Sequence, residues 1–202
     1  MKGLQSGLRE WMAWHRRNYA APSPNFVKRQ VLMRNGFPNA TWIETGTYRG
    51  DTTAALARVA RRVVSLEPAA ELFAAAQARF SRTPNIELLN ATSEETFPRL
   101  LPELTGSICF WLDGHFSGGQ TFKGPNDTPI LAELADIGEN LHRWDGAAVL
   151  IDDIRLFAGG VHVYGPYPPL DDLVTWSARH RLAWHIEHDI FVARRSVGAH
   201  PQ

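Results

Sequence analysis

Acidic residues stand at the ends of several strand-like segments of this chain. Glu44, Glu67 and Asp113 each close a short apolar or β-branched run, and the pair Asp152 and Asp153 closes another. Parallel strands bring their carboxyl ends to one edge of a sheet, where ligands bind, so we expect these carboxylates to converge. An acid after a strand can also cap the next helix. Convergence beside a glycine turn favours a ligand site.

That glycine turn, with the sequence ETGTYRG, follows the first of these strands. Gly46 and Gly50 suit a tight turn with close backbone approach. A dinucleotide fingerprint, Gly-x-Gly-x-x-Gly, leaves bare backbone against a pyrophosphate, whereas Tyr48 and Arg49 would crowd one here. Glu67, after the second strand, can accept two hydrogen bonds from a ribose diol. The pattern predicts an adenosine-like ligand without a phosphate chain.

The elements that position these residues alternate between strands and helices. Strands are expected at residues 41–44, 63–67, 86–89, 107–112, 147–151, 182–186 and 190–194. Helices are expected at residues 3–18, 26–34, 52–62, 69–80, 93–101, 128–143 and 170–180. The short gap between the last two strands indicates an antiparallel hairpin. We predict an α/β fold: a doubly wound, mostly parallel, seven-stranded Rossmann-like sheet with an antiparallel C-terminal strand.

Composition excludes several classes of protein. The 202 residues suit one compact domain, and no apolar run approaches the roughly 18 residues of a membrane span. Lysine plus arginine (21) balances aspartate plus glutamate (21), so the global positive field of a general nucleic-acid binder is absent. The single cysteine, Cys109, excludes an intrachain disulfide and suits a reducing cytoplasm, where it is expected to be buried and inert. We expect a cytoplasmic protein with no nucleic-acid or membrane partner.

The domain organisation is predicted in two parts. Residues 1–40 form a helical extension, and residues 41–202 form the ligand-binding domain. Trp11 and Trp14 in the extension either pack internally or cover the site or a partner subunit, which suggests a homodimer. A long glycine-rich loop at residues 115–127 is expected to help select the substrate.

Together these features resemble class I S-adenosylmethionine-dependent methyltransferases over about residues 40–195. The residues that carry the resemblance are Glu44, Gly46, Gly50, Glu67, Asp113 and Gly114, with the terminal hairpin. One departure is Tyr48, which stands where the family's fuller motif has a glycine. Residues 113–119 (DGHFSGG) and 151–153 (IDD) resemble the small-molecule O-methyltransferase branch with the macrocin-type enzymes, which often use a divalent metal.

The resemblance implies a set of contacts for S-adenosyl-L-methionine. The set is Glu44, Gly46, Thr47, Tyr48, Gly50, Thr52, Thr53, Glu67, Pro68, Asn90, Thr92, Ser93, Asp113 and Gly114. Glu44 would face the methionine part and reach its amino group through water. Thr52 and Thr53 would bind the carboxylate. Asp113 would close over the methionine end.

The remaining contacts would hold the nucleoside part of the same cofactor. The resemblance assigns the ribose hydroxyls to Glu67 and a place beside the adenine to Pro68. Asn90, Thr92 and Ser93 are candidates for the adenine edge.

Methyl transfer is an in-line displacement, and an alcohol acceptor needs a base or a metal to lower its pKa. His115, assigned to the catalytic set with Asp113, either is that base or only hydrogen-bonds its loop. Asp152 and Asp153 offer hard oxygen ligands for Mg²⁺, Mn²⁺ or Ca²⁺. Adjacent strand residues point to opposite sides, so both can bind one ion only at a bend. Alternatively, one of the pair caps the backbone or pairs with an arginine such as Arg155.

Three functions remain open from the sequence. The first is a methyltransferase acting on a hydroxyl of a small molecule, such as a sugar or natural product. The second is a non-catalytic, nucleotide-binding Rossmann-like module. The third is an NAD-dependent oxidoreductase, against which Tyr48 and the lack of a separate substrate domain count.

Overall fold

The computed structural model of the chain describes residues 2–114, 129–162 and 165–195. Its helices are α1 (Lys2–Arg16), α2 (Asn25–Asn35), α3 (Asp51–Leu56), α4 (Ala70–Phe80), α5 (Ser93–Leu100), α6 (Ile130–Asn140) and α7 (Leu170–Arg179). Its strands are β1 (Thr41–Thr45), β2 (Arg62–Leu66), β3 (Ile86–Leu89), β4 (Ser107–Leu112), β5 (Gly146–Ile151), β6 (Gly160–His162), β7 (Gly165–Tyr167), β8 (Ala183–Glu187) and β9 (Ile190–Arg195).

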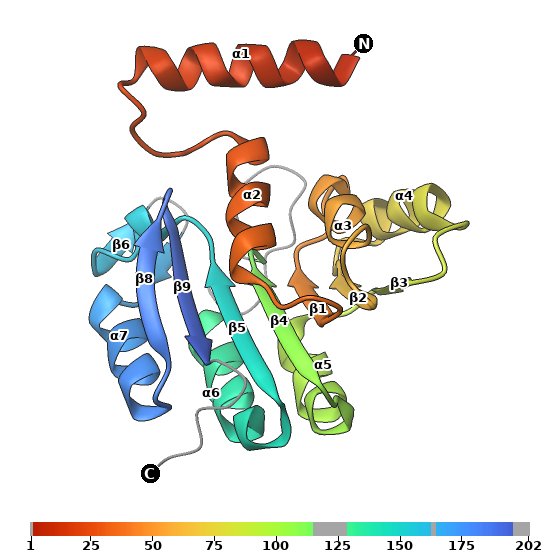
Figure 1. Ribbon diagram of the computed structural model, residues 1–202, viewed down its shortest axis with the longest axis vertical. Helices are drawn as coiled ribbons and strands as arrows, with labels where there is room; N and C mark the ends of the chain where they lie inside the picture. The colour runs from red at the N-terminus through yellow and green to blue at the C-terminus, as the bar shows by residue number, and fades with distance from the viewer. Residues whose placement is uncertain (1, 115–128, 163–164, 196–202) are drawn as a thin grey trace.

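One sheet of seven strands organises the chain, in the order β3-β2-β1-β4-β5-β9-β8 (Figure 1). The strands from β3 to β5 pair in parallel, and β9 runs antiparallel to both of its neighbours. The predicted doubly wound, mostly parallel sheet with an antiparallel C-terminal strand is therefore confirmed.

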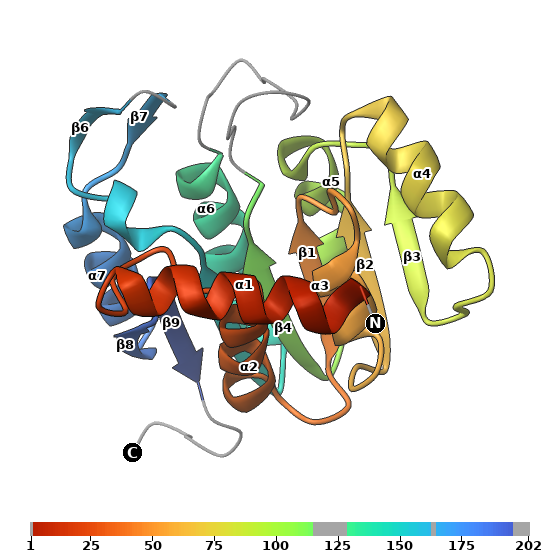
Figure 2. The same ribbon diagram turned by 90° about the horizontal axis from the view of Figure 1, so that it is seen from above.

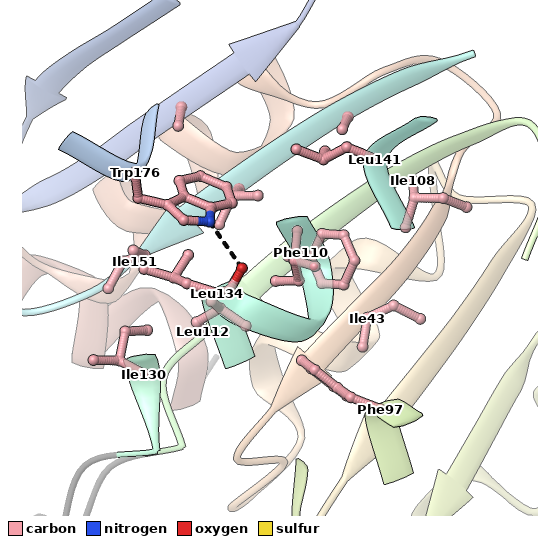
Figure 3. Packing of buried hydrophobic residues seen from close by; sticks show 14 of the residues in the cluster. Ile43, Phe97, Ile108, Phe110, Leu112, Ile130, Leu134, Leu141, Ile151 and Trp176 are labelled. Atoms are coloured by element: carbon pink, nitrogen blue, oxygen red, sulfur yellow. Dashed lines mark hydrogen bonds between the residues drawn. The ribbon is translucent and has the colours of Figure 1, made fainter. Parts of the chain in front are cut away.

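Helices cover both faces of this sheet, as the two ribbon views show (Figures 1 and 2). One face packs apolar side chains of α5, α6 and α7 against the strands, and the other packs those of α2 and α3. On the first face, the Trp176 indole of α7 donates a hydrogen bond of 2.8 Å to the Leu134 carbonyl of α6 (Figure 3). Burial on both faces explains why β4 and β5 are nearly continuous apolar runs.

The register of the parallel strands aligns their carboxyl ends. One row across the sheet contains Leu89, Leu66, Thr45, Leu112 and Ile151. The residue that follows each of these positions consequently lies at the same edge of the sheet.

Helix α3 is shorter than the predicted segment 52–62, because it ends at Leu56. The Asn85 side chain donates to the carbonyls of Ala57 and Ala60, at 2.8 Å and 3.2 Å. These long-range bonds satisfy carbonyls that a longer helix would have used, so the alanine-rich sequence stops being helical before β2.

Two further boundaries differ from the prediction. Helix α6 begins at Ile130 rather than at residue 128 and ends at Asn140, where the chain continues as the 3₁₀ turn Leu141–Arg143. The short pair β6–β7 is absent from the prediction, because three-residue strands carry no detectable periodicity.

Helix α1 is attached to the domain near its C-terminal end. Trp14 is buried and its ring meets the ring of His188 at 5.7 Å, while the Glu10 carboxylate accepts the Asn25 amide at 3.2 Å. Figure 1 shows the rest of α1 lying apart from the layers of the domain. Its exposed apolar side chains include Leu8, Trp11 and Met12. No helix in the described residues is long and apolar enough to cross a membrane.

Helix α2, in contrast, belongs to the core. Val31 and Leu32 are fully buried (0% exposed) and pack with residues of the sheet, including Trp42 and Val192. The helix therefore stabilises the sheet although it precedes the first strand.

We expect Leu32→Ala to lower the free energy of unfolding by about 2–5 kcal/mol, because it leaves a cavity in this core. Urea unfolding followed by circular dichroism measures the change. The matched control is Gln30→Ala on the exposed side of the same helix, which should change stability by less than about 0.5 kcal/mol. Equal stability of the two variants would contradict the role of α2 in the core.

Candidate functional site

The carboxyl edge of the parallel strands brings most of the predicted site residues together. Asn90, Glu67, Gly46, Asp113 and Asp152 each follow the aligned last row of a strand. The backbone amides of all but Asn90 continue the hydrogen-bond ladder of the sheet and donate to carbonyls of the neighbouring strand at 2.9–3.3 Å. The predicted convergence of acids at one edge is confirmed.

The glycine turn after β1 has the geometry that its sequence predicts. Gly46 (φ 86°) and Gly50 (φ 75°) both lie in the left-handed region. A Cβ atom on Gly46 would stand 2.8 Å from the Asp113 carbonyl oxygen, and one on Gly114 would stand 3.0 Å from the Thr45 side chain. The backbones that follow β1 and β4 therefore cross in contact, with no room for a side chain.

Tyr48 also adopts the left-handed conformation, with φ 48°. The methyltransferase family that the sequence resembles has a glycine at this position. The Tyr48 backbone adopts a conformation that glycine favours. The Tyr48 side chain is 47% exposed and lies next to the Arg49 guanidinium, 5.3 Å from its ring centre. The turn thus carries two large side chains at the surface.

The Glu67 carboxylate is fixed by backbone amides. Oε2 accepts the Tyr48 amide at 2.7 Å, and Oε1 accepts the Ala69 amide at 3.1 Å. Each carboxylate oxygen has a second lone pair, so Glu67 can accept two more hydrogen bonds. The Asn90 side chain donates to the carbonyls of Glu67 and Pro68, at 2.8 Å and 3.2 Å, and so holds this loop in place.

The Glu44 carboxylate lies beneath the turn in a buried network of hydroxyls. Its Oε2 atom accepts hydrogen bonds from Thr53 at 2.5 Å and from Ser65 at 2.6 Å. Thr47 lies 2.6 Å from the Ser65 hydroxyl and, because Ser65 donates to Glu44, donates to Ser65 in turn. Glu44 is 1% exposed and Thr53 is 0% exposed. These two side chains face each other beneath the turn, and a contact of either with a ligand stays a prediction.

Burial also changes the acidity of Glu44. Removal from water raises the pKa of Glu44 to about 7, against the opposing hydrogen bonds from Ser65 and Thr53. The nearby Glu67 charge raises it further.

The candidates for the adenine edge have local structural roles. The Thr92 hydroxyl accepts the Glu95 amide at 3.3 Å, and the Glu95 carboxylate accepts the Thr92 amide at 3.2 Å, which makes a capping box at the start of α5. Ser93 is buried in the first turn of that helix. Any contact of Thr92 or Ser93 with a ligand stays a prediction.

Asp113 and Gly114 follow the end of β4, with Asp113 half-buried and Gly114 exposed. Asp113 is close enough to Lys28 and Asp152 to shift the pKa of both. His115, the predicted base, lies outside the described residues.

Asp152 and Asp153 share one cation, the Lys28 ammonium of α2. The Lys28 Nζ atom lies 2.6 Å from Oδ2 of Asp152 and 3.2 Å from Oδ1 of Asp153. The bend required for both carboxylates to reach one ion is present, because β5 ends at Ile151 and Asp153 has φ 56°. The Asp153 amide also donates to Oδ1 of Asp152 at 2.8 Å.

The charges in this cluster shift one another's titration. Burial and the Asp113 charge raise the pKa of Asp152 to about 8, against the attraction of Lys28. Burial lowers the pKa of Lys28, but the charges of Asp152 and Asp153 outweigh it, and the pKa of Lys28 is raised overall.

A second cation extends the cluster. The Arg155 guanidinium lies 2.7 Å from Oδ1 of Asp153 and also contacts the Asp189 carboxylate. The Arg155 amide donates to Asp189 Oδ1 at 2.9 Å. The alternative that Asp153 pairs with Arg155 is therefore confirmed.

The predicted metal ligands Asp152 and Asp153 are both paired with Lys28. A metal bound by both Asp152 and Asp153 would need the space that the Lys28 ammonium occupies. In the part of the chain that the structure describes, no group of three or more His, Cys, Asp or Glu side chains is placed to hold a metal ion. The two aspartates are thus partners of Lys28 in the described residues, and a metal bound by them stays a prediction.

Lys28 and Asp189 are the two site residues that sequence reasoning missed. Both are distant in sequence from their partners, since Lys28 precedes Asp152 by 124 positions. One signal was present: only three of the 21 basic residues are lysines, at positions 2, 28 and 123. A lysine in an arginine-rich chain indicates a position that uses a compact, flexible charge.

Comparisons with known proteins identify the fold. The chain of the 23S rRNA methyltransferase ErmE superposes with a TM-score of 0.54 and 18% identity, over 90% of this chain and 71% of that one. The YcgJ protein from Bacillus subtilis gives 0.56 and 11% identity, over 80% and 70%. The mycolic acid cyclopropane synthase CmaA1, complexed with S-adenosylhomocysteine (SAH) and CTAB, gives 0.52 and 10% identity, over 80% and 61%.

No protein-family model and no curated protein matches the sequence. The likeness to solved structures shows that the chain has the Rossmann-like fold found in methyltransferases.

The crossing of the two loops predicts that Gly46 cannot be replaced. Gly46→Ala should lower the free energy of unfolding by about 1–3 kcal/mol, because alanine is strained at positive φ and its Cβ meets the Asp113 carbonyl. Thermal and urea unfolding measure the effect. Gly7→Ala is the control, since a Cβ there meets nothing within 4 Å. A Gly46→Ala protein as stable as Gly7→Ala would refute the close crossing.

The buried Glu44 predicts a dependence of stability on pH. Its pKa is higher in the folded protein (about 7) than the ordinary value of 4.5, so its contribution is complete below pH 4.5 and is lost as the pH rises towards 7. The full loss is about 3 kcal/mol at about 1.4 kcal/mol per pH unit. Urea unfolding between pH 5 and 8 should show a flatter profile for Glu44→Gln than for the wild type. The exposed control Glu103→Gln should keep the wild-type slope; a Glu44→Gln profile parallel to the wild type would contradict the assignment.

Proposed function

We propose that this chain is an S-adenosylmethionine-dependent methyltransferase that transfers a methyl group to a hydroxyl of a small molecule, such as a sugar or natural product. The observation that carries the proposal is the Glu67 carboxylate at the end of β2, held by two backbone amides beside the glycine turn. The methyltransferase-like fold is consistent with it.

Glu67 is suited to bind a ribose diol. Its two oxygens are fixed in orientation by the amides of Tyr48 and Ala69, and each keeps one lone pair for a further donor. Two neighbouring ribose hydroxyls present two donors at a matching spacing. The chemistry of this donor set therefore fits the adenosine part of the cofactor.

The turn favours a nucleoside without phosphates. The side chains of Tyr48 and Arg49 stand where a dinucleotide-binding turn has bare backbone. This observation supports S-adenosylmethionine over NAD as the ligand.

When bound, S-adenosylmethionine supplies an electrophilic methyl group on its sulfonium. The task of the protein is to hold donor and acceptor in line and to accept the proton of the hydroxyl. In this proposal the donor binds at the loop after β1 and the acceptor at the loop after β4, and these two loops are in contact at Gly46 and Asp113. A role for His115 as the base remains part of the proposal.

The acceptor side favours a neutral, hydroxyl-bearing molecule. Asp113, Asp152 and Asp153 gather at this edge, and carboxylates accept hydrogen bonds from hydroxyls but repel phosphates. The whole chain has no net positive charge. ErmE is a 23S rRNA methyltransferase, but an acidic edge supports a small-molecule acceptor rather than RNA for this chain.

The first test is calorimetric titration with SAH. We expect micromolar binding to the wild type and binding weaker by about tenfold to a hundredfold in Glu67→Ala, because hydrogen bonds to a charged group are lost. Glu87→Ala is the control, since Glu87 is an exposed carboxylate of β3 paired with Arg62. No heat and no thermal shift at millimolar SAH would reject the methyltransferase, and binding of NAD would favour an oxidoreductase.

A further inference from the structure

We infer that the Lys28 ammonium is the built-in cation of the acidic cluster at the end of β5 and stands in the position for which the sequence predicts a divalent metal. Any effect of Lys28 on the acceptor rests on the proposed function, whereas its occupation of the position between the two aspartates does not.

The geometry supports this assignment. Lys28 Nζ contacts carboxylate oxygens of both Asp152 and Asp153, at 2.6 Å and 3.2 Å. A divalent ion bound by the same two carboxylates needs oxygen contacts of about 2.0–2.6 Å from a single point between them. The ammonium and the ion therefore compete for one place.

The burial of the cluster favours a resident cation. The Asp152 side chain is 3% exposed and the Lys28 side chain is 13% exposed, so bulk water solvates neither charge well. An unpaired buried carboxylate is costly.

The fold delivers this cation from the N-terminal helix. Val31 and Leu32 are three and four residues beyond Lys28, on the same side of α2, and both are fully buried in the core. The helix is thus fixed in rotation and directs Lys28 towards the end of β5. Lys28 is accordingly a positioning residue for the two aspartates.

The test is titration with Mn²⁺, followed by calorimetry and by the Mn²⁺ electron paramagnetic resonance signal. We expect the wild type to show no Asp152-dependent binding at millimolar Mn²⁺. Lys28→Ala should gain a site with a Kd on the order of 10⁻⁴ M, which is lost again in Lys28→Ala/Asp152→Asn. Arg34→Ala is the matched control on the same helix, since Arg34 pairs with Glu187 instead, and should gain nothing.

Two results would overturn the inference. One is Mn²⁺ binding to the wild type that is abolished by Asp152→Asn, because the ion would then displace Lys28. This measurement does not require the Lys28→Ala variant to fold. The other is a folded Lys28→Ala protein that binds no Mn²⁺. SAH titration of the same samples tests the proposed methyltransferase separately. A Mn²⁺ result that contradicts the role of Lys28 is therefore distinguishable from a failure of the proposed function.

Discussion

The burial of carboxylates at the ends of parallel strands is the constraint on which this molecule depends. Parallel pairing aligns the strand ends, and the sequence places an acid at most of them. Each buried acid must be protonated, hydrogen-bonded or paired, because an isolated charge is not stable away from water. The chain uses a different solution each time: hydroxyls for Glu44, backbone amides for Glu67, and the ammonium of Lys28 for Asp152.

These solutions also connect the parts of the fold. The Glu44 network joins β1, α3 and β2 through Thr53 and Ser65. The contact between Glu67 and the amide of Tyr48 fixes the turn after β1 against the end of β2. The pair of Lys28 with Asp152 ties α2 to the end of β5. The same interactions that neutralise the acids therefore determine the shape of the candidate site.

Sequence reasoning predicted the sheet, its antiparallel end and the edge where the acids meet, because alternating apolar strands and helices determine these features locally. It also predicted the tight turn at Gly46 and Gly50, in which both glycines adopt positive φ. It could not find the Lys28 pair, which joins residues 124 positions apart, or the early end of α3, which depends on the distant Asn85. It assigned Asp152 and Asp153 to a metal, since a bend that directs both to one cation is compatible with an ion or an ammonium. His115 lies outside the described residues, so its role is still a prediction from sequence.

The position of Lys28 has a consequence for how such proteins diversify. The first forty residues were expected to be a helical extension outside the ligand-binding domain, and such a segment could be exchanged between relatives without affecting that domain. Here that segment also carries core side chains, Val31 and Leu32, and the charge that balances the acidic edge. Replacing this segment with one from a relative would alter the folding and the electrostatics of the protein together. Recombination is therefore compatible with this fold only when helix α2 and the end of β5 are inherited as one unit.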